Sequence, residues 1–205
     1  MKILNKKFVY LISPNKITGE IFYDDLKKIF LTKKVSFFQL RLKKEKFNKK
    51  IIIARKILKL CRKYKVKLLI NDDPYLTLKV NADGCHLGQS DMDIFKAKKL
   101  LGNKIIGITC HNSFRLAKVA KLKNATYIGL GAFFKSDTKK TPIKADIKTL
   151  NKIRISLNIP IVAIGGINEK NYKKLLLNNA DFLAISGYIW NNIKDKPHKA
   201  ILKLK

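Results

Sequence analysis

Charged side chains that could act together in one reaction recur in short segments along the chain. Asp72 and Asp91 are carboxylates that could share a divalent cation, and Arg41, Lys43 and Lys139 are cations that could hold a diphosphate. In proteins, Mg²⁺ is usually held by one or two carboxylates together with phosphate oxygens of the substrate. These residues therefore indicate a metal–diphosphate site, provided that the fold brings them together.

A second group of residues has little charge but suits the binding of a monophosphate. Gly165 and Gly166 follow an apolar run, and Ser186-Gly187 follows another and opens an expected helix. Glycines and helix starts present backbone N–H groups to a phosphate. Each motif also has a structural interpretation, because the segment Asn71-Asp72-Asp73 is typical of a turn or a helix cap and Gly165-Gly166 of a tight turn.

The elements that must position these residues alternate regularly between short apolar runs and longer amphipathic runs. The expected strands span residues 8–13, 35–40, 67–70, 84–87, 104–110, 126–129, 160–164 and 182–186. The expected helices span residues 20–31, 46–64, 74–80, 92–101, 113–122, 147–157, 169–178 and 187–204. Strict alternation favours parallel strands that are joined by crossover helices.

Eight strand–helix units are the number that closes a (β/α)8 TIM barrel. We therefore expect an α/β fold with one TIM-barrel domain over residues 1–205, since no linker or low-complexity segment divides the chain. An open, doubly wound sheet is the rival, although no GxGxxG follows the first strand. In a barrel, chemistry occurs at the carboxyl ends of the strands, where all the segments named above fall.

The charge raises nucleic acid or an anionic membrane surface as partners, because Lys and Arg number 45 against 14 Asp and Glu. Only five of those 45 are Arg, the residue best suited to reading base edges, and the lysines are spread along the chain. We expect small-molecule substrates and no specific nucleic-acid or membrane partner, and a homo-oligomer is left open. The apolar stretch near the N-terminus is too short for a signal-peptide core, and three cysteines without CxxC spacing indicate reduced thiols, so we expect a cytoplasmic protein.

Five segments together resemble one enzyme family, the thiamine phosphate synthases. They are Gln39-Leu40-Arg41-Leu42-Lys43, Ile70-Asn71-Asp72-Asp73, residues 82–89 with His86-Leu87-Gly88-Gln89, residues 127–131, and Val162-Ala163-Ile164-Gly165-Gly166-Ile167. The resemblance runs in order from about residue 10 to residue 189. It implies a TIM barrel that joins a hydroxymethylpyrimidine diphosphate to a thiazole phosphate and releases diphosphate.

The resemblance also implies roles for individual residues. The pyrimidine diphosphate would be held by Gln39, Leu40, Arg41, Leu42, Lys43, Asn71, Thr109 and Lys139, of which Arg41, Lys43, Thr109 and Lys139 would be catalytic. The metal would be Mg²⁺ on Asp72 and Asp91. The thiazole phosphate would meet Ser136, Asp137, Thr138, Gly166, Ile185 and Ser186. Leu42 departs from the family, where a Glu is common.

Two alternatives differ from the synthase in what they require of the chain. The related thiazole tautomerase shares the barrel and resembles the region of His111, but it needs no diphosphate site. The synthase is favoured because the chain retains the residues of such a site together, namely Arg41, Lys43, Asn71, Asp72, Asp91 and Lys139. A basic nucleic-acid-binding protein is the other alternative, and its binding would weaken steeply with salt.

Overall fold

The computed structural model describes residues 7–135 and 145–205, and the strands within these ranges close into a barrel. The strands are β1 (Val9–Ile12), β2 (Val35–Leu40), β3 (Lys67–Asn71), β4 (Gly84–Leu87), β5 (Ile105–His111), β6 (Tyr127–Gly131), β7 (Ile161–Ile164) and β8 (Phe182–Ile185). All neighbours pair in parallel, and β8 pairs with β1 to close the sheet. The expected α/β TIM barrel is confirmed, and the open sheet is excluded.

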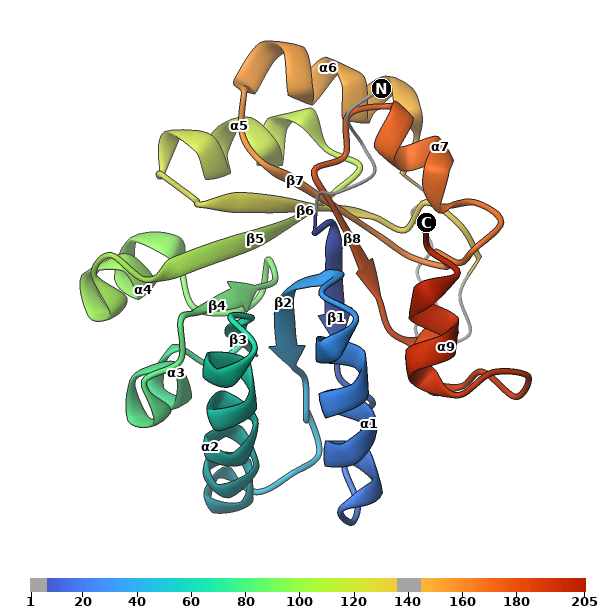
Figure 1. Ribbon diagram of the computed structural model, residues 1–205. Helices are drawn as coiled ribbons and strands as arrows, with labels where there is room; N and C mark the ends of the chain where they lie inside the picture. The colour runs from blue at the N-terminus through green and yellow to red at the C-terminus, as the bar shows by residue number, and fades with distance from the viewer. Residues whose placement is uncertain (1–6, 136–144) are drawn as a thin grey trace.

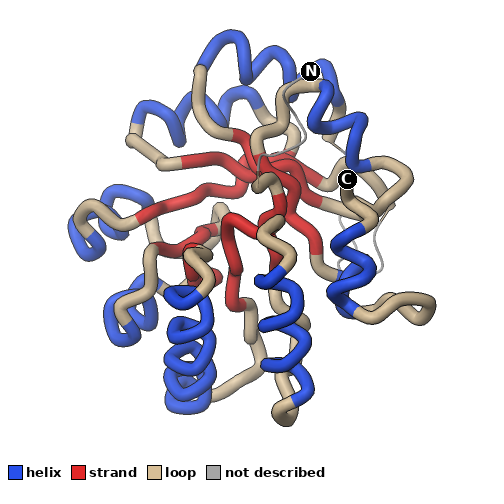
Figure 2. Tube along the Cα trace, in the orientation of Figure 1, coloured by secondary structure: helices blue, strands red, loops and turns tan. Residues whose placement is uncertain are grey.

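Helices lie outside the ring of strands, as Figures 1 and 2 show. They are α1 (Ile21–Leu31), α2 (Phe47–Lys63), α3 (Pro74–Val80), α4 (Ile94–Leu101), α5 (Phe114–Leu122), α6 (Ile147–Leu157), α7 (Tyr172–Leu177), α8 (Gly187–Trp190) and α9 (Pro197–Leu202). Within the described ranges, no helix is long and apolar enough to cross a membrane.

The starts of several helices follow from capping residues in the sequence. The side chain of Asp73 accepts a hydrogen bond from the backbone N–H of Leu76, and Asp93, Ser113 and Asp146 cap α4, α5 and α6 in the same way. Such caps satisfy N–H groups that have no partner inside the helix. The short polar residues between apolar runs therefore fix where each crossover begins.

The closing segment differs from the sequence-based expectation of one helix over residues 187–204. It contains two short helices, α8 and α9, and a connection over residues 191–196 separates them. Pro197 is the physical reason, because proline lacks an N–H and clashes with the preceding turn in a helix interior. Proline is well suited to the first helical turn, and Pro197 stands there in α9.

The apolar core has two parts, one on each side of the barrel wall. The larger part lies between strands and helices and includes Leu40, Leu42 and the three cysteines, all buried. The smaller part fills the barrel interior and includes Tyr10, Leu69, Tyr127 and Val162. A side chain that points inward near the carboxyl end of a strand therefore stands on a packed floor, which is the position that a rigid site needs.

Candidate active site

A cavity of about 770 Å³ opens at the carboxyl end of the barrel. Residues at or just beyond the ends of all eight strands line it, from Ser13 after β1 to Ser186 after β8. The volume lies in the range of small-molecule sites, roughly 300–1,000 Å³. The barrel therefore provides one connected site into which residues distant in sequence project.

Two cations stand on the side of the cavity formed by β2 and its following loop. The Arg41 guanidinium donates from Nη1 to Oδ1 of Asn15 at 2.9 Å, and the Arg41 backbone N–H donates to Oγ of Ser13, also at 2.9 Å. Neither partner carries charge, so within the described residues the positive charge of Arg41 is available for an anionic ligand. Lys43 lies further along the loop, and its Nζ is 3.0 Å from Oδ2 of Asp72.

The expected metal ligands, Asp72 and Asp91, face each other across the ends of β3 and β4. Burial alone would raise the pKa of Asp72, but hydrogen bonding and charge from Lys43 hold it below its ordinary value. Burial and the neighbouring Asp72 carboxylate raise the pKa of Asp91 above its ordinary value, although the Gly88 N–H donates to its Oδ2 at 2.6 Å. Asp72 itself has a left-handed backbone with φ of 61°, a conformation that aspartate tolerates.

This donor set fits a hard divalent cation. Two carboxylates that face each other gain from a positive charge between them, and Mg²⁺ binds protein carboxylates and phosphate oxygens while keeping several waters. Within residues 7–135 and 145–205, no group of three or more His, Cys, Asp and Glu side chains forms a metal cluster. A zinc site would require such nitrogen or sulfur ligands. The chemistry of Asp72 and Asp91 therefore suits a metal that substrate phosphates complete.

The opposite side of the cavity is formed by glycines and backbone after β7 and β8. Gly165 and Gly166 have φ of +106° and +62°, and a Cβ on Gly165 would lie 2.4 Å from the Cβ of Ala132. Both positions therefore require glycine. Within the described part of the chain, the backbone N–H groups of Gly166 and Ser186 donate to no protein acceptor. Unused N–H groups at the rim of a cavity suit a phosphate.

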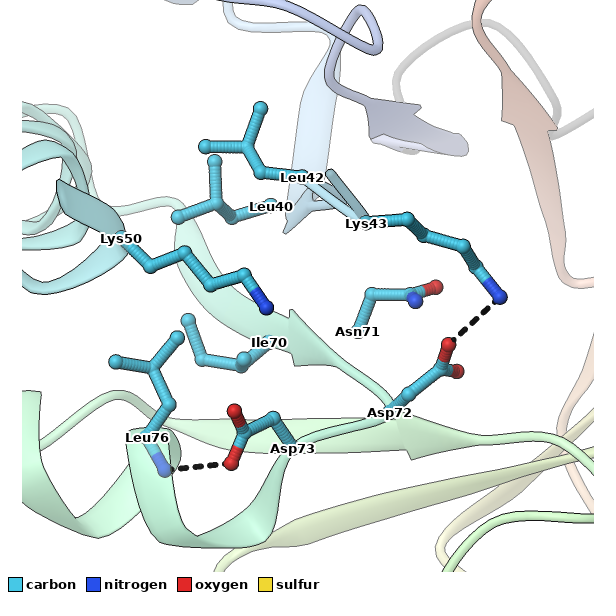
Figure 3. A pocket seen from close by; sticks show the side chains of 9 residues that line it. All are labelled: Leu40, Leu42, Lys43, Lys50, Ile70, Asn71, Asp72, Asp73 and Leu76. Carbon is cyan, nitrogen blue, oxygen red and sulfur yellow. Dashed lines mark hydrogen bonds and ion pairs between the residues drawn. The ribbon is translucent and has the colours of Figure 1, made fainter. Parts of the chain in front are cut away.

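A smaller pocket of about 290 Å³ adjoins this site on the far side of β2 and β3 (Figure 3). Leu40 and Leu42, which the resemblance assigned to the substrate, line this pocket and not the main cavity. The period of two along a strand explains this, because Gln39 and Arg41 face the interior while their neighbours face α2. Asp73 also belongs to this side, where Figure 3 shows it bound to the Leu76 N–H as a helix cap.

The structure brings most of the expected site residues to the main cavity. Those that line it are Gln39, Arg41, Lys43, Asn71, Asp72, Asp91, Thr109, Gly166, Ile185 and Ser186. The expected residues Ser136, Asp137, Thr138 and Lys139 lie outside the described residues. His111 lines the cavity as well, with a left-handed φ of 53° at an irregularity of β5.

The site residues expected from the sequence did not include His86, Asn15, Gln89 or Tyr10, all of which line the cavity. His86 Nε2 is 2.8 Å from Oγ1 of Thr109, and Nδ1 is 2.9 Å from the Tyr127 hydroxyl. Burial lowers the pKa of His86 to about 4, so the imidazole is neutral at pH 7. Alternation along β4 was the signal that could have placed His86 inward, but a strand of four residues gives that signal little length.

Comparisons with known proteins agree with this geometry. A family model described as thiamine monophosphate synthase matches residues 9–189. A protein of Pelagibacter ubique named thiamine-phosphate synthase is 62% identical over 202 residues, which cover 98% of each chain. A protein of the same name from Rhodospirillum centenum is 36% identical over 90% of this chain and 89% of its own.

Solved structures show the same likeness in three dimensions. A thiamine phosphate pyrophosphorylase from Pyrococcus furiosus superposes with a TM-score of 0.85 at 30% identity, over 98% of this chain and 94% of that one. The 3-hexulose-6-phosphate synthase of Salmonella typhimurium has a TM-score of 0.69 at 16% identity, over 96% of each chain, and shares the fold alone.

Proposed function

The chain belongs to the thiamine monophosphate synthase family and is a transferase of thiamine biosynthesis, and from this premise we propose how its side chains carry out the transfer. The reaction joins 4-amino-2-methyl-5-hydroxymethylpyrimidine diphosphate to a thiazole phosphate and gives thiamine phosphate and diphosphate. The supporting observation is a cavity with Arg41, Lys43, Asp72 and Asp91 on one side and, on the other, backbone N–H groups that have no acceptor among the described residues.

The pyrimidine diphosphate takes the cationic side of the cavity in this proposal. Arg41 and Lys43 hold its phosphate oxygens, and Asn71 and Gln39 contribute polar contacts near the end of the barrel interior. Lys43 moves from Asp72 to the diphosphate, because an exposed ion pair of this kind is worth at most about 1 kcal/mol. The side chain of Thr109 stands on the floor of the cavity and meets the same ligand.

Asp72 and Asp91 hold Mg²⁺ in the working enzyme. When bound there, Mg²⁺ supplies positive charge to the diphosphate and lowers the cost of its departure. Hydrogen bonding and charge from Lys43 lower the pKa of Asp72, and the Asp72 carboxylate becomes available to the cation when Lys43 moves to the diphosphate.

The displacement needs charge stabilisation and position more than a base. The C–O bond between the pyrimidine methylene and the diphosphate breaks, and its electron pair goes to the diphosphate oxygen that Arg41 and Lys43 stabilise. The electron-rich aminopyrimidine stabilises the cation that remains on the methylene. The thiazole nitrogen then gives its lone pair to the methylene carbon, so a new C–N bond forms without proton transfer. Correct placement of the two rings supplies most of what this second step requires.

The thiazole phosphate takes the opposite side, where its phosphate meets the backbone at Gly166, Ile185 and Ser186. The sequence resemblance adds Ser136, Asp137 and Thr138 to this ligand and Lys139 to the diphosphate, and we retain these as proposals. We also propose that residues 1–205 act as one domain, in the cytoplasm, on small molecules and without a specific nucleic acid.

Purified protein with both substrates and Mg²⁺ tests this function. We expect thiamine phosphate and diphosphate to appear in equal amounts, and chelation of the metal to stop both. The family relatives named thiamine-phosphate synthase favour this result over thiazole tautomerisation. Conversion of a thiazole carboxylate phosphate to its tautomer, without any condensation of the two substrates, would contradict the proposal.

A further inference from the structure

Four side chains form a continuous hydrogen-bonded chain across the barrel interior. The Tyr10 hydroxyl on β1 is 2.8 Å from the Tyr127 hydroxyl on β6, which is 2.9 Å from Nδ1 of His86 on β4. Nε2 of His86 is in turn 2.8 Å from Oγ1 of Thr109 on β5. Tyr10, which is 2% exposed and packs among apolar residues, forms one end of this hydrogen-bonded series, and Thr109 forms the other; both residues line the cavity.

Two glycines leave the space that this chain occupies. A Cβ on Gly107 would lie 1.9 Å from Cζ of Tyr127, and a Cβ on Gly129 would lie 3.2 Å from Cε1 of His86. The first separation is shorter than any real contact, so a side chain at Gly107 would displace the Tyr127 ring. The barrel is thus packed around these rings, which have little freedom to find other partners.

The number of donors decides the direction of the hydrogen bonds. Among the described residues, the Tyr10 hydroxyl has one partner, Tyr127. If Thr109 donated to His86, then His86 would donate to Tyr127, and only one of the two tyrosine hydroxyls could donate to the other. The proton of the remaining tyrosine hydroxyl would have no acceptor among the described residues. A buried donor without an acceptor costs about 1–3 kcal/mol. In the opposite direction, Tyr10 donates to Tyr127, Tyr127 to Nδ1 of His86, and Nε2–H of His86 to Thr109.

Only the second direction satisfies every buried donor. It also leaves the proton of the Thr109 hydroxyl unused by the chain and free to point into the cavity. The imidazole must be neutral for this arrangement, and no carboxylate hydrogen-bonds to its ring in the described residues. Burial raises the pKa of both tyrosines, so both hydroxyls keep their protons.

We infer that the chain from Tyr10 through Tyr127 and His86 fixes Thr109 as a hydrogen-bond donor toward a phosphate oxygen of the ligand. His86 holds the Nε2–H tautomer, and Tyr10, Tyr127 and His86 are positioning residues, because they act through Thr109. The identity of that ligand as the pyrimidine diphosphate rests on the proposed function, whereas the direction of the hydrogen bonds does not.

Nitrogen NMR of the histidine side chains tests the direction without any substrate. The protein has three histidines, and the variants His111→Gln and His198→Gln assign the signals of His86 by elimination. At pH 7.5 we expect His86 to carry its proton on Nε2 alone. A proton on Nδ1 alone, or a proton on both nitrogens, would overturn the inference.

The Tyr127→Phe variant tests the link to the ligand. It removes the donor to Nδ1, so we expect the Nδ1–H form of His86 to become populated and the KM for the pyrimidine diphosphate to rise by about fivefold, as the loss of about 1 kcal/mol implies. The KM for the thiazole phosphate should stay within about twofold. Tyr172→Phe is the matched control, because Tyr172 is equally buried and donates to a backbone carbonyl outside the chain of four.

The two readouts separate failure of the inference from failure of the function. Equal effects of Tyr127→Phe on both KM values, or the same effects from Tyr172→Phe, would contradict a role through Thr109. An enzyme that makes no thiamine phosphate, yet shows the Nε2–H tautomer, would refute the proposed function while supporting the direction of the hydrogen bonds.

Discussion

Gly165 combines a positive φ with a close approach to Ala132, and its replacement by alanine measures how tightly the loop after β6 packs on the end of β7. With φ of +106°, Gly165 lies in a region that alanine avoids, which costs about 1–3 kcal/mol. The new Cβ would also lie 2.4 Å from the Cβ of Ala132 and 2.6 Å from its Cα, and overpacking of this kind costs a further 1–3 kcal/mol or so. We expect Gly165→Ala to lower the free energy of unfolding by roughly 2–6 kcal/mol.

Gly19→Ala is the matched control. Gly19 has φ of +67°, and a Cβ there would meet no atom within 4 Å, so only the backbone penalty of about 1–2 kcal/mol applies. Urea denaturation of both variants measures the difference. At a temperature where Gly165→Ala is folded, its KM for the thiazole phosphate should rise more than its KM for the pyrimidine diphosphate. Equal destabilisation by the two substitutions would refute the close packing at Gly165.

Three other changes have definite expected outcomes. Asp72→Ala or Asp91→Ala should remove most turnover but leave the binding of the thiazole phosphate intact, and the double variant should be little worse than either single one, since both residues act through one ion. Near wild-type turnover in both single variants, together with a parent enzyme whose turnover a chelator does not change, would exclude the metal. Asn15→Ala should raise the KM for the pyrimidine diphosphate about two- to fivefold through Arg41 without changing the Tm, which steady-state kinetics and a melting curve can check. The pKa of His86 is about 4 in the folded protein and near 6.5 in the unfolded chain, so the unfolded state binds more protons as the pH falls. The free energy of unfolding should therefore drop by about 3 kcal/mol between pH 6.5 and 4, and in denaturant titrations it should depend less on pH in His86→Gln.

The fold was predictable from the sequence because the signals that define it are local. The alternation of apolar runs with amphipathic runs, and capping residues such as Asp73 and Ser113, placed all eight strands and most helix ends within a few residues. The exception was the closing segment. The apolar pattern continues across Pro197 and predicted one helix there, although the proline marks the start of a new one.

The site was predictable wherever a residue follows a strand on the inward side. Arg41, Asp72 and Asp91 reached the cavity as expected, because the carboxyl ends of parallel strands meet at one face. Leu40 and Leu42 do not line the main cavity. The resemblance assigned every residue from Gln39 to Lys43 to the substrate, whereas successive side chains of a strand point to opposite faces.

The residues that sequence reasoning missed depend on contacts between distant strands. Asn15 matters through Arg41, and the chain of Tyr10, Tyr127, His86 and Thr109 joins four different strands. No local pattern encodes such contacts, because they arise from the register of a closed barrel. Asn71 pairs with His86, and Thr109 with Gly129, only once that register is set.

Product formation by the Arg41→Met variant, compared with the parent protein, tests the central claim most directly. The parent protein should condense the pyrimidine diphosphate and the thiazole phosphate in the presence of Mg²⁺ and release one diphosphate per thiamine phosphate. Arg41→Met keeps an unbranched side chain but removes the charged guanidinium group, so kcat/KM for the pyrimidine diphosphate should fall by about 100-fold, as for other donors to a developing anion. Unchanged condensation by a folded Arg41→Met protein would contradict the claim that the cationic side of this cavity stabilises the departing diphosphate.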